Sequence, residues 1–140
     1  MPARKKPRRI WAPSSRRQPK PKIPSYLKER VGTEANRLVE EVLKPRYVEP
    51  PPAEMQWNYR IDVYTAWFRG YLYFCATYAC PGPNALSPTF EKRFARMEYA
   101  GEERFHLAFM RYTGEWIEIY RDFTADQALA AIRDDPYFYA

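Results

Sequence analysis

The chain has 140 residues, a net charge of +6 and an apolar fraction of 46 %, which predicts one domain with a single hydrophobic core. No stretch approaches the roughly 20 apolar residues of a membrane span, and the first residues lack the apolar segment of a secretory signal. Its two cysteines form no disulfide framework, which is typical of a reducing compartment. We therefore expect a cytoplasmic protein without a membrane span.

Charge divides the chain at residue 24. Residues 1–24 carry nine Lys or Arg, six Pro and no acid, whereas residues 25–140 carry 14 bases against 17 acids. Because proline removes hydrogen-bond donors and like charges repel, residues 1–24 are predicted to be a disordered, basic, Pro-rich tail. Residues 25–140 hold 23 of the 24 aromatic residues and are expected to form the single domain.

The first predicted element is a helix that begins at Ser25, a typical N-cap residue. Its apolar positions recur at helical spacing and are Leu27, Val31, Ala35, Leu38, Val39 and Val42. Pro45 predicts that the helix ends at about Lys44. Gly32 lies inside it, which costs about 1 kcal/mol relative to Ala.

A β-hairpin is expected next, because Trp57–Phe68 alternates with period two. Arg69-Gly70 is the predicted turn, and Tyr71–Cys80 is the returning strand. The pairs that follow are Phe68 with Tyr71, Trp67 with Leu72, Val63 with Ala76, and Ile61 with Tyr78. One face is then the apolar core side, and the other carries Arg60, Asp62, Tyr64, Tyr71, Tyr73 and Thr77.

Three more strands and a helix complete the prediction, after a loop over residues 81–89. The strands are expected at Arg93–Tyr99, Arg104–Tyr112 and Glu115–Tyr120, with turns at Ala100–Glu103 and Thr113-Gly114. Thr124 and Gln127 have the spacing of a capping box, and the helix that follows presents Ala128, Leu129 and Ile132 and ends before Pro136. The predicted fold is α+β, a five-stranded antiparallel meander with an N-terminal and a C-terminal helix packed on one face.

The run FEKRFARMEYAGEERFHLAFMRYTGEWIEIY and the ending ALAAIRDDPYFYA resemble a family of small bacterial domains of unknown function. The likeness extends from about Leu38 to Phe138. It implies a leading helix, a strand meander, and a terminal helix that ends in an acidic-Asp-Pro-aromatic element. The family usually places a histidine after the tryptophan of the last strand, whereas Ile117 follows Trp116 here. The resemblance implies a fold and no particular activity.

The tail is the main functional feature. The residues of its basic clusters, together with its one aromatic residue, are Arg4, Lys5, Lys6, Arg8, Arg9, Trp11, Arg16 and Arg17. The cations can neutralise phosphates, and Trp11 can stack on an unpaired base. We predict a non-enzymatic binding module tethered to nucleic acid, RNA or DNA, without sequence specificity. The alternatives are a protein-interaction or scaffold domain with a solubilising tail, a tail that binds an acidic protein or a membrane surface, and an enzyme of unknown class.

Arginines also neighbour aromatic residues in the later strands, and Arg96, Arg111 and Trp116 form a candidate base-stacking surface of the sheet. A structural role is favoured, because Arg111 is expected to face Trp116 across the Thr113-Gly114 turn as a cation–π pair. In this register one face holds Phe105, Leu107, Phe109, Trp116 and Tyr120, and the other holds Ala108, Met110, Ile117 and Ile119. The helices can bury one of these apolar faces, and burial of the other by a second subunit predicts a homodimer.

No cofactor, metal or catalytic residue is predicted. Cys75 and Cys80 are an odd number of residues apart, so on one strand they point to opposite faces and cannot share a zinc ion. His106 is the only histidine.

Two acid–base hypotheses stay open. Glu118, between Trp116 and Tyr120 and across from Phe109, is expected to have a raised pKa, and a structural carboxylate bonded to Arg104 or Arg111 is favoured over a general base. His106 with Glu118 or Glu98 is the other arrangement.

Overall fold

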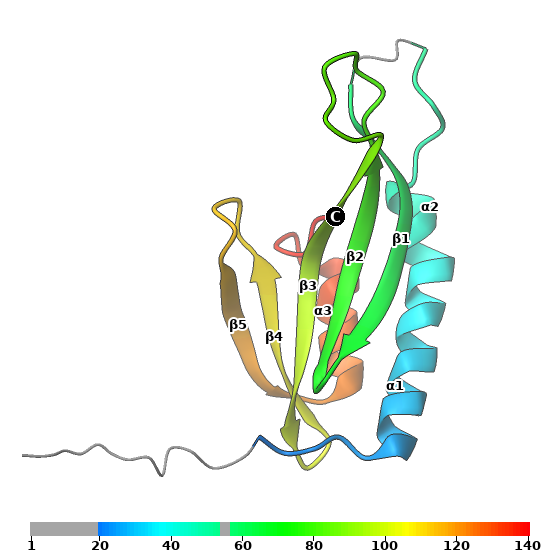
Figure 1. The fold of residues 1–140 in the computed structure, drawn as a ribbon. Helices are drawn as coiled ribbons and strands as arrows, with labels where there is room; N and C mark the ends of the chain where they lie inside the picture. The colour runs from blue at the N-terminus through cyan, green and yellow to red at the C-terminus, as the bar shows by residue number, and fades with distance from the viewer. Residues whose placement is uncertain (1–19, 54–56) are drawn as a thin grey trace, which may run out of the picture.

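The computed structural model describes residues 20–53 and 57–140. The elements in this part of the chain are α1 (Ser25–Leu38), a π-helical turn (Val39–Leu43), α2 (Lys44–Tyr47), β1 (Tyr59–Phe68), β2 (Tyr71–Ala79), β3 (Thr89–Gly101), β4 (Arg104–Met110), β5 (Trp116–Phe123) and α3 (Ala125–Asp134). Along the chain, helices come before and after an unbroken run of strands (Figure 1). The predicted α+β class is confirmed.

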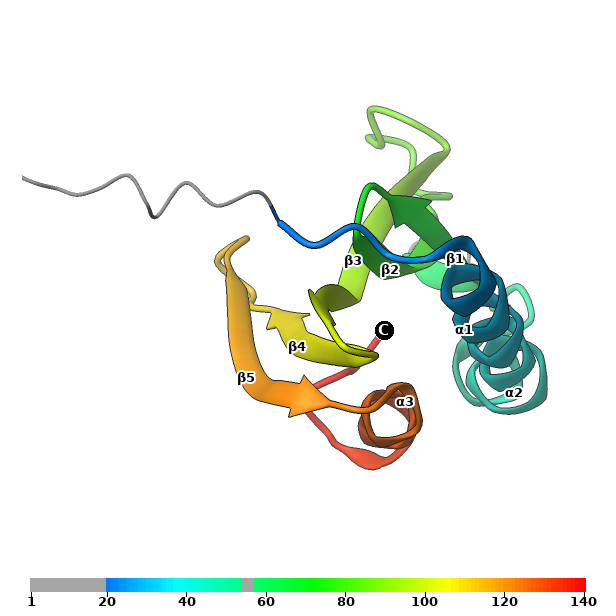
Figure 2. The ribbon, with the colours of Figure 1, turned by 90° about the horizontal axis from the view of Figure 1, so that it is seen from below.

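The described strands form one antiparallel sheet in the order β1-β2-β3-β4-β5, so each strand pairs with its neighbour in sequence. The sheet is twisted and curves around α1 and α3, which lie on the same side of it (Figure 2). The predicted meander, with both helices on one face, is therefore confirmed. Within the described residues, no helix is long and apolar enough to cross a bilayer.

The N-terminal helix continues past Pro45 to Tyr47, so the prediction that it ends at Lys44 was wrong. A proline in a regular α-helix removes one hydrogen bond, and its ring collides with the carbonyl four residues back. Here the preceding turn is π-helical, and the Lys44 N–H bonds the Val39 carbonyl, five residues back. This wider turn lets the helix accept Pro45 and gain one more turn, which buries Tyr47.

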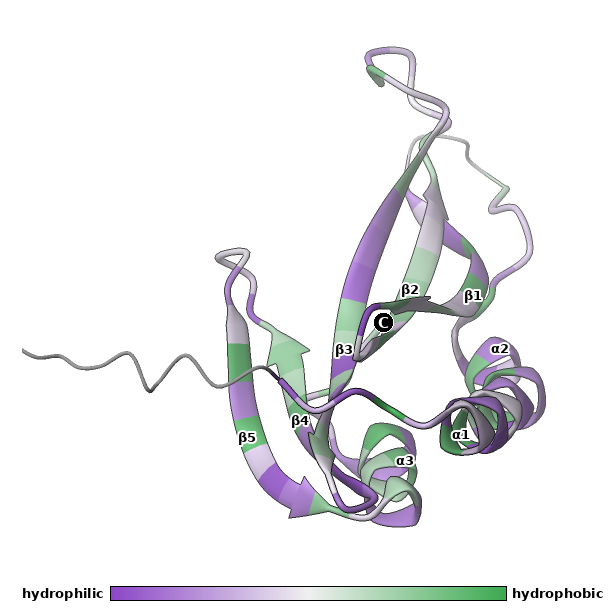
Figure 3. Ribbon diagram, turned by 60° about the horizontal axis from the view of Figure 1, so that its bottom comes forward, coloured by the Kyte–Doolittle hydropathy of each residue, from purple (hydrophilic) through white to green (hydrophobic). Residues whose placement is uncertain are grey.

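The core lies between the helices and the covered face of the sheet. α1 buries Leu27, Val31 and Ala35, and α3 buries Ala125, Ala128, Leu129 and Ile132. The large fully buried rings are Phe74, Phe94, Phe105 and Phe138. Figure 3 shows α3 mainly in hydrophobic colours and the early part of β3, which is largely exposed, in hydrophilic ones.

The β1–β2 register is the predicted one along most of the hairpin. Phe68 pairs with Tyr71, Trp67 with Leu72 and Val63 with Ala76. The fourth predicted pair was wrong, because a bulge between Arg60 and Asp62 brings Arg60 opposite Tyr78. A bulge adds one unpaired residue to a strand, and Ile61, expected in the core, is consequently 39 % exposed.

The β4–β5 register differs from the prediction by one residue. Met110, not Arg111, pairs with Trp116. The loop has three residues rather than two, since the Arg111 N–H bonds the Glu115 carbonyl at 2.8 Å and Gly114 takes a φ of 90°. A slip of one residue moves a side chain to the other face, so Trp116 lies on the opposite side from Phe105 and Leu107.

The predicted capping box of the last helix is confirmed. Thr124 Oγ1 accepts a hydrogen bond from the Gln127 N–H at 3.2 Å, and Gln127 Oε1 accepts one from the Thr124 N–H at 2.9 Å. β3 begins at Thr89, four residues before the predicted start.

Candidate binding surface on the open face of the sheet

The side of the sheet away from α1 and α3, called the open face below, carries two cross-strand rows of side chains. One row is Phe68, Tyr71, Glu98 and His106, and the other is Ala66, Tyr73, Arg96, Ala108 and Glu118. In Figure 1 α3 lies behind the sheet, so the open face is turned toward the viewer. The predicted placement of Tyr71 and Tyr73 away from the core side is confirmed, although Tyr73 is itself only 8 % exposed.

Arg96 occupies the centre of the open face. Its guanidinium carbon lies 5.0 Å from the ring centre of Tyr71 and 4.9 Å from that of Trp116. Its Nε is buried and has no hydrogen-bond partner among the described residues. An unpaired donor in such a place leaves part of the desolvation penalty of the guanidinium uncompensated. Cation–π contact with two rings offsets some of it.

Arg93 extends the same cluster toward the next row. Its guanidinium carbon is 4.3 Å from the ring centre of Tyr73. Tyr73 in turn lies 5.9 Å from Tyr71 and 5.8 Å from Trp116, ring centre to ring centre. We call Tyr71, Tyr73, Arg93, Arg96 and Trp116 the arginine–aromatic cluster. Arginines and aromatic rings contact one another throughout this cluster.

The carboxylates of the open face have other partners. Glu91 accepts a hydrogen bond from the Tyr64 hydroxyl, and Glu98 lies 3.1 Å from Lys20 Nζ. Glu118 is bonded to Arg121. Among the described residues no carboxylate forms a salt bridge with Arg93 or Arg96. The positive charge of these two arginines is thus not neutralised by an acid of the described chain.

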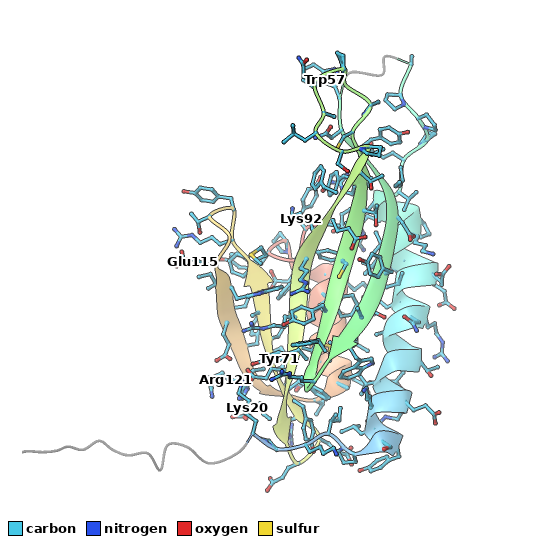
Figure 4. All side chains as sticks on the ribbon, in the orientation of Figure 1. Lys20, Trp57, Tyr71, Lys92, Glu115 and Arg121 are labelled. Atoms are coloured by element: carbon cyan, nitrogen blue, oxygen red, sulfur yellow. The ribbon has the colours of Figure 1, made fainter. Side chains whose placement is uncertain are left out.

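Lys20, the first described residue, brings the end of the basic tail to this face. Its ammonium donates to the Tyr71 hydroxyl and lies 4.8 Å from the centre of the Tyr71 ring. Hydrogen bonds to Tyr71 and Glu98 raise the pKa of Lys20, so it stays charged. Figure 4 shows Lys20 beside Tyr71 at one end of the sheet. The predicted tail residues Arg4, Lys5, Lys6, Arg8, Arg9, Trp11, Arg16 and Arg17 lie outside the described residues.

The predicted Arg111–Trp116 pair is wrong, and Arg96 takes the place of Arg111. Because of the three-residue loop, Arg111 lies at the loop base, 3.9 Å from Glu115 and 5.9 Å from the ring centre of Tyr112. The sequence indicates Arg96 and Trp116 as surface candidates, and their place in the arginine–aromatic cluster depends on the pairing of β2 with β3. That pairing places Tyr73 opposite Arg96, with a bulge between Phe74 and Cys75, and alternation within each strand does not set such a register.

The two acid–base hypotheses meet in one cluster at the end of the open face. Glu118 lies opposite Ala108 rather than Phe109, and its partner is Arg121 rather than Arg104 or Arg111. His106 lies opposite Glu98, its Nδ1 accepts a hydrogen bond from the Asp122 N–H at 3.2 Å, and its Nε2 is 3.2 Å from Arg121 Nη2. Arg121 therefore stands between His106 and Glu118.

The cysteines are both free thiols. Cys75 is buried on the open face opposite Tyr64 and Arg93, and desolvation raises the pKa of its thiol. In the ranges that the structure describes, no group of three or more His, Cys, Asp or Glu side chains could hold a metal ion.

Comparison with known families and proteins gives one match. Residues 22–139 match a family described as "Domain of unknown function (DUF3024)". This match covers most of the chain, so the protein belongs to that family, and the predicted resemblance to a family of unknown function is confirmed. No curated protein and no solved structure matches the chain significantly.

Proposed function

We propose that the protein is a non-enzymatic nucleic-acid-binding module. In this proposal the basic residues of positions 1–24 supply most of the affinity through phosphate contacts. The arginine–aromatic cluster receives further phosphates of the same strand. The supporting observation is the pair Arg93 and Arg96, two guanidinium groups held on ring faces without a carboxylate partner among the described residues.

Guanidinium groups suit this role because their planar fork of N–H donors matches phosphate oxygens. The rings beneath Arg93 and Arg96 are already occupied by these arginines, so we assign them to holding the guanidinium groups rather than to stacking bases. Phosphate contacts position a strand without reading its sequence. The module is accordingly expected to bind RNA and DNA with little sequence preference.

The test measures fluorescence anisotropy of labelled single- and double-stranded RNA and DNA with the full chain at two salt concentrations. A tail variant replaces Arg4, Lys5, Lys6, Arg8, Arg9, Arg16 and Arg17 by Gln. If all seven cations contact a single strand, the slope of log affinity against log salt becomes shallower by about 5. Binding that is unchanged in the tail variant would contradict the role given to the tail.

A second variant, Arg93→Gln with Arg96→Gln, tests the sheet. Its matched control, Arg37→Gln with Arg133→Gln, removes the same charge from α1 and α3. The open-face variant is expected to weaken binding about tenfold or more, because two charge-assisted contacts are lost. The control is expected to bind within about twofold of the unmodified protein. If the open-face variant and the control lost equal affinity, net charge alone would explain the effect, and the proposed role of the cluster would be wrong.

One observation favours the alternative of a protein-interaction domain. Large apolar side chains are exposed at the loop end of the sheet, namely Trp57 (69 %), Leu86 (105 %) and Phe90 (42 %). Failure of the full chain to bind any of the four nucleic acids at low salt would put this alternative first. The predicted homodimer, with its interface on the second apolar face of the sheet, is a separate proposal, and sedimentation of the full chain is its measurement.

A further inference from the structure

A cleft of about 760 Å³ lies beside the arginine–aromatic cluster. One wall is the segment that leads into α1, with Lys20, Lys22 and Ile23, and the other is the turn between β1 and β2, with Arg69. The size falls within the range of small-molecule sites in proteins.

The charge of the cleft is strongly asymmetric. Four cations line it, Lys20, Lys22, Lys28 and Arg69, against one carboxylate, Glu98. Glu98 is paired with Lys20 at 3.1 Å. Within the described residues the other three cations form no salt bridge. Three like charges around one hollow repel one another, and an anion that enters the hollow relieves this repulsion.

Apolar surface accompanies these charges. The lining includes Phe68, Tyr71 and Tyr99, and Phe68 is 56 % exposed. The Arg69 guanidinium carbon lies 5.1 Å from the Phe68 ring centre, so a cation and a ring are offered together. A free inorganic anion would use only the first of the two.

The start of α1 adds partial positive charge. Ser25, its first residue, lines the cleft, no side chain among the described residues caps this end, and the first turn has no acid. Unpaired N–H groups at a helix N-terminus favour an anion.

We propose that this cleft binds a phosphate monoester with a planar aromatic body, about the size of a mononucleotide. The phosphate would lie among Lys22, Lys28 and Arg69, and the planar body against Phe68. Such a group occurs both in a free nucleotide and at the 5′ end of a nucleic-acid strand. This proposal does not depend on the proposed function, because it concerns a compact ligand and not a strand held by the tail.

The test is titration calorimetry of the full chain with adenosine monophosphate, adenosine and inorganic phosphate. Adenosine monophosphate is expected to bind at least tenfold more tightly than either of the others. Adenosine that binds as well as its monophosphate would overturn the proposal, and so would inorganic phosphate that binds as well.

Two variants locate the site. Arg69→Asn removes a cleft cation where φ is 57°, a conformation that Asn tolerates better than Arg, so folding is expected to be preserved. Lys28→Gln removes a second cation, and Arg37→Gln on the same helix is the control outside the lining. Each cleft variant is expected to weaken binding of adenosine monophosphate about tenfold, and the control less than twofold. Equal effects of all three would overturn the location.

The tail variant described above separates this proposal from the proposed function. It is expected to retain binding of adenosine monophosphate while losing affinity for long strands. With the same variant, the affinity for a trinucleotide with a 5′-phosphate is compared with the affinities for adenosine monophosphate and for the same trinucleotide with a 5′-hydroxyl. The 5′-hydroxyl trinucleotide is expected to bind most weakly, and equal binding of both trinucleotides would contradict a phosphate site. A preference for the phosphorylated trinucleotide over adenosine monophosphate assigns the site to strand ends, and the reverse assigns it to free nucleotides. Loss of adenosine monophosphate binding in the tail variant would overturn the cleft as a separate site.

Discussion

At the scale of single residues, the open face depends on how side chains satisfy one another. Arg96 has two rings and a buried Nε without a partner among the described residues, whereas Arg60 combines ring contacts with Tyr47, Tyr78 and Tyr139, a bond to Glu49 and a bond to the Ala140 carbonyl. Because these contacts connect β1 to α2 and to the C-terminal residues, we assign Arg60 a structural role. Arg96 has no comparable set of hydrogen-bond acceptors among the described residues, and for this reason we assign it to phosphate in the proposed function.

The change Arg96→Met tests this difference. Met keeps an unbranched apolar stem against Tyr71 and Trp116 and removes the unpaired donor, so the free energy of unfolding is expected to change by less than about 1 kcal/mol. Nucleic-acid affinity is expected to fall about fivefold to tenfold. Urea unfolding and anisotropy measure the two. A large loss of stability with unchanged affinity would show that Arg96 is purely structural.

The effect of a substitution at Gly32 depends on a single neighbour, Trp67. A Cβ built there would lie 3.2 Å from Trp67 Nε1, so α1 approaches β1 closely at this point. Gly32→Ala is expected to gain less than the roughly 1 kcal/mol of its helix propensity, because the indole must move. In a Trp67→Leu background the same change is expected to gain the full amount. Equal gains in both backgrounds, measured by urea unfolding, would show that the two residues are not coupled.

At the scale of elements, local contacts at the ends of helices decide where each helix begins and how far it continues. α3 begins at a complete capping box formed by Thr124 and Gln127, and the N-terminal helix passes Pro45 through its π-helical turn. The long β3 strand pairs with β2 from Thr89 to Glu98 and with β4 from Ala95 to Gly101. The open face is therefore a property of β2, β3 and their neighbours together.

Replacement of Thr124 by Ala is expected to destabilise the protein by about 1 kcal/mol, because the Gln127 N–H loses its acceptor. Thr124→Ser retains the hydroxyl and is expected to stay within about 0.3 kcal/mol of the unmodified protein. Thermal unfolding followed by circular dichroism compares the two. An equal loss in both variants would mean that the methyl group, not the cap, matters.

At the scale of the whole molecule, the protonation of several side chains links stability to pH. The pKa values of Tyr64 and Tyr120 are raised, mainly by hydrogen bonds to Glu91 and Asp135, and desolvation raises that of Cys75. The pKa values of Lys20 and Lys44 are also raised, mainly by hydrogen bonds. Each of these groups holds its proton more tightly in the folded state than in the unfolded chain.

Stability is therefore expected to fall as the pH rises above about 9, where the unfolded chain begins to lose protons that the folded protein retains. Lys92 acts in the opposite direction, because burial lowers its pKa. Urea unfolding at pH 7, 9 and 10 measures the effect, and Tyr64→Phe is expected to make the decline shallower. Constant stability between pH 7 and 10 would contradict this expectation.

Local pattern in the sequence determined much of this fold. Period-two alternation located five strands, helical spacing located α1, and one pair of residues, Thr124 and Gln127, located the start of α3. The division of charge at residue 24 also comes from the sequence alone. These features were predictable because each depends on residues only a few positions apart.

Register and partnership were decided by the tertiary structure. The bulge beside Ile61, the three-residue loop that ends at Gly114 and the π-helical turn before Pro45 each shift the chain by a single residue, and no local periodicity reports such a shift. The contact between Arg96 and Trp116 depends on two of the strand pairings at once. For that reason the sequence indicated which residue types meet on the open face, and only the folded chain decided that Arg96, rather than Arg111, lies on the tryptophan.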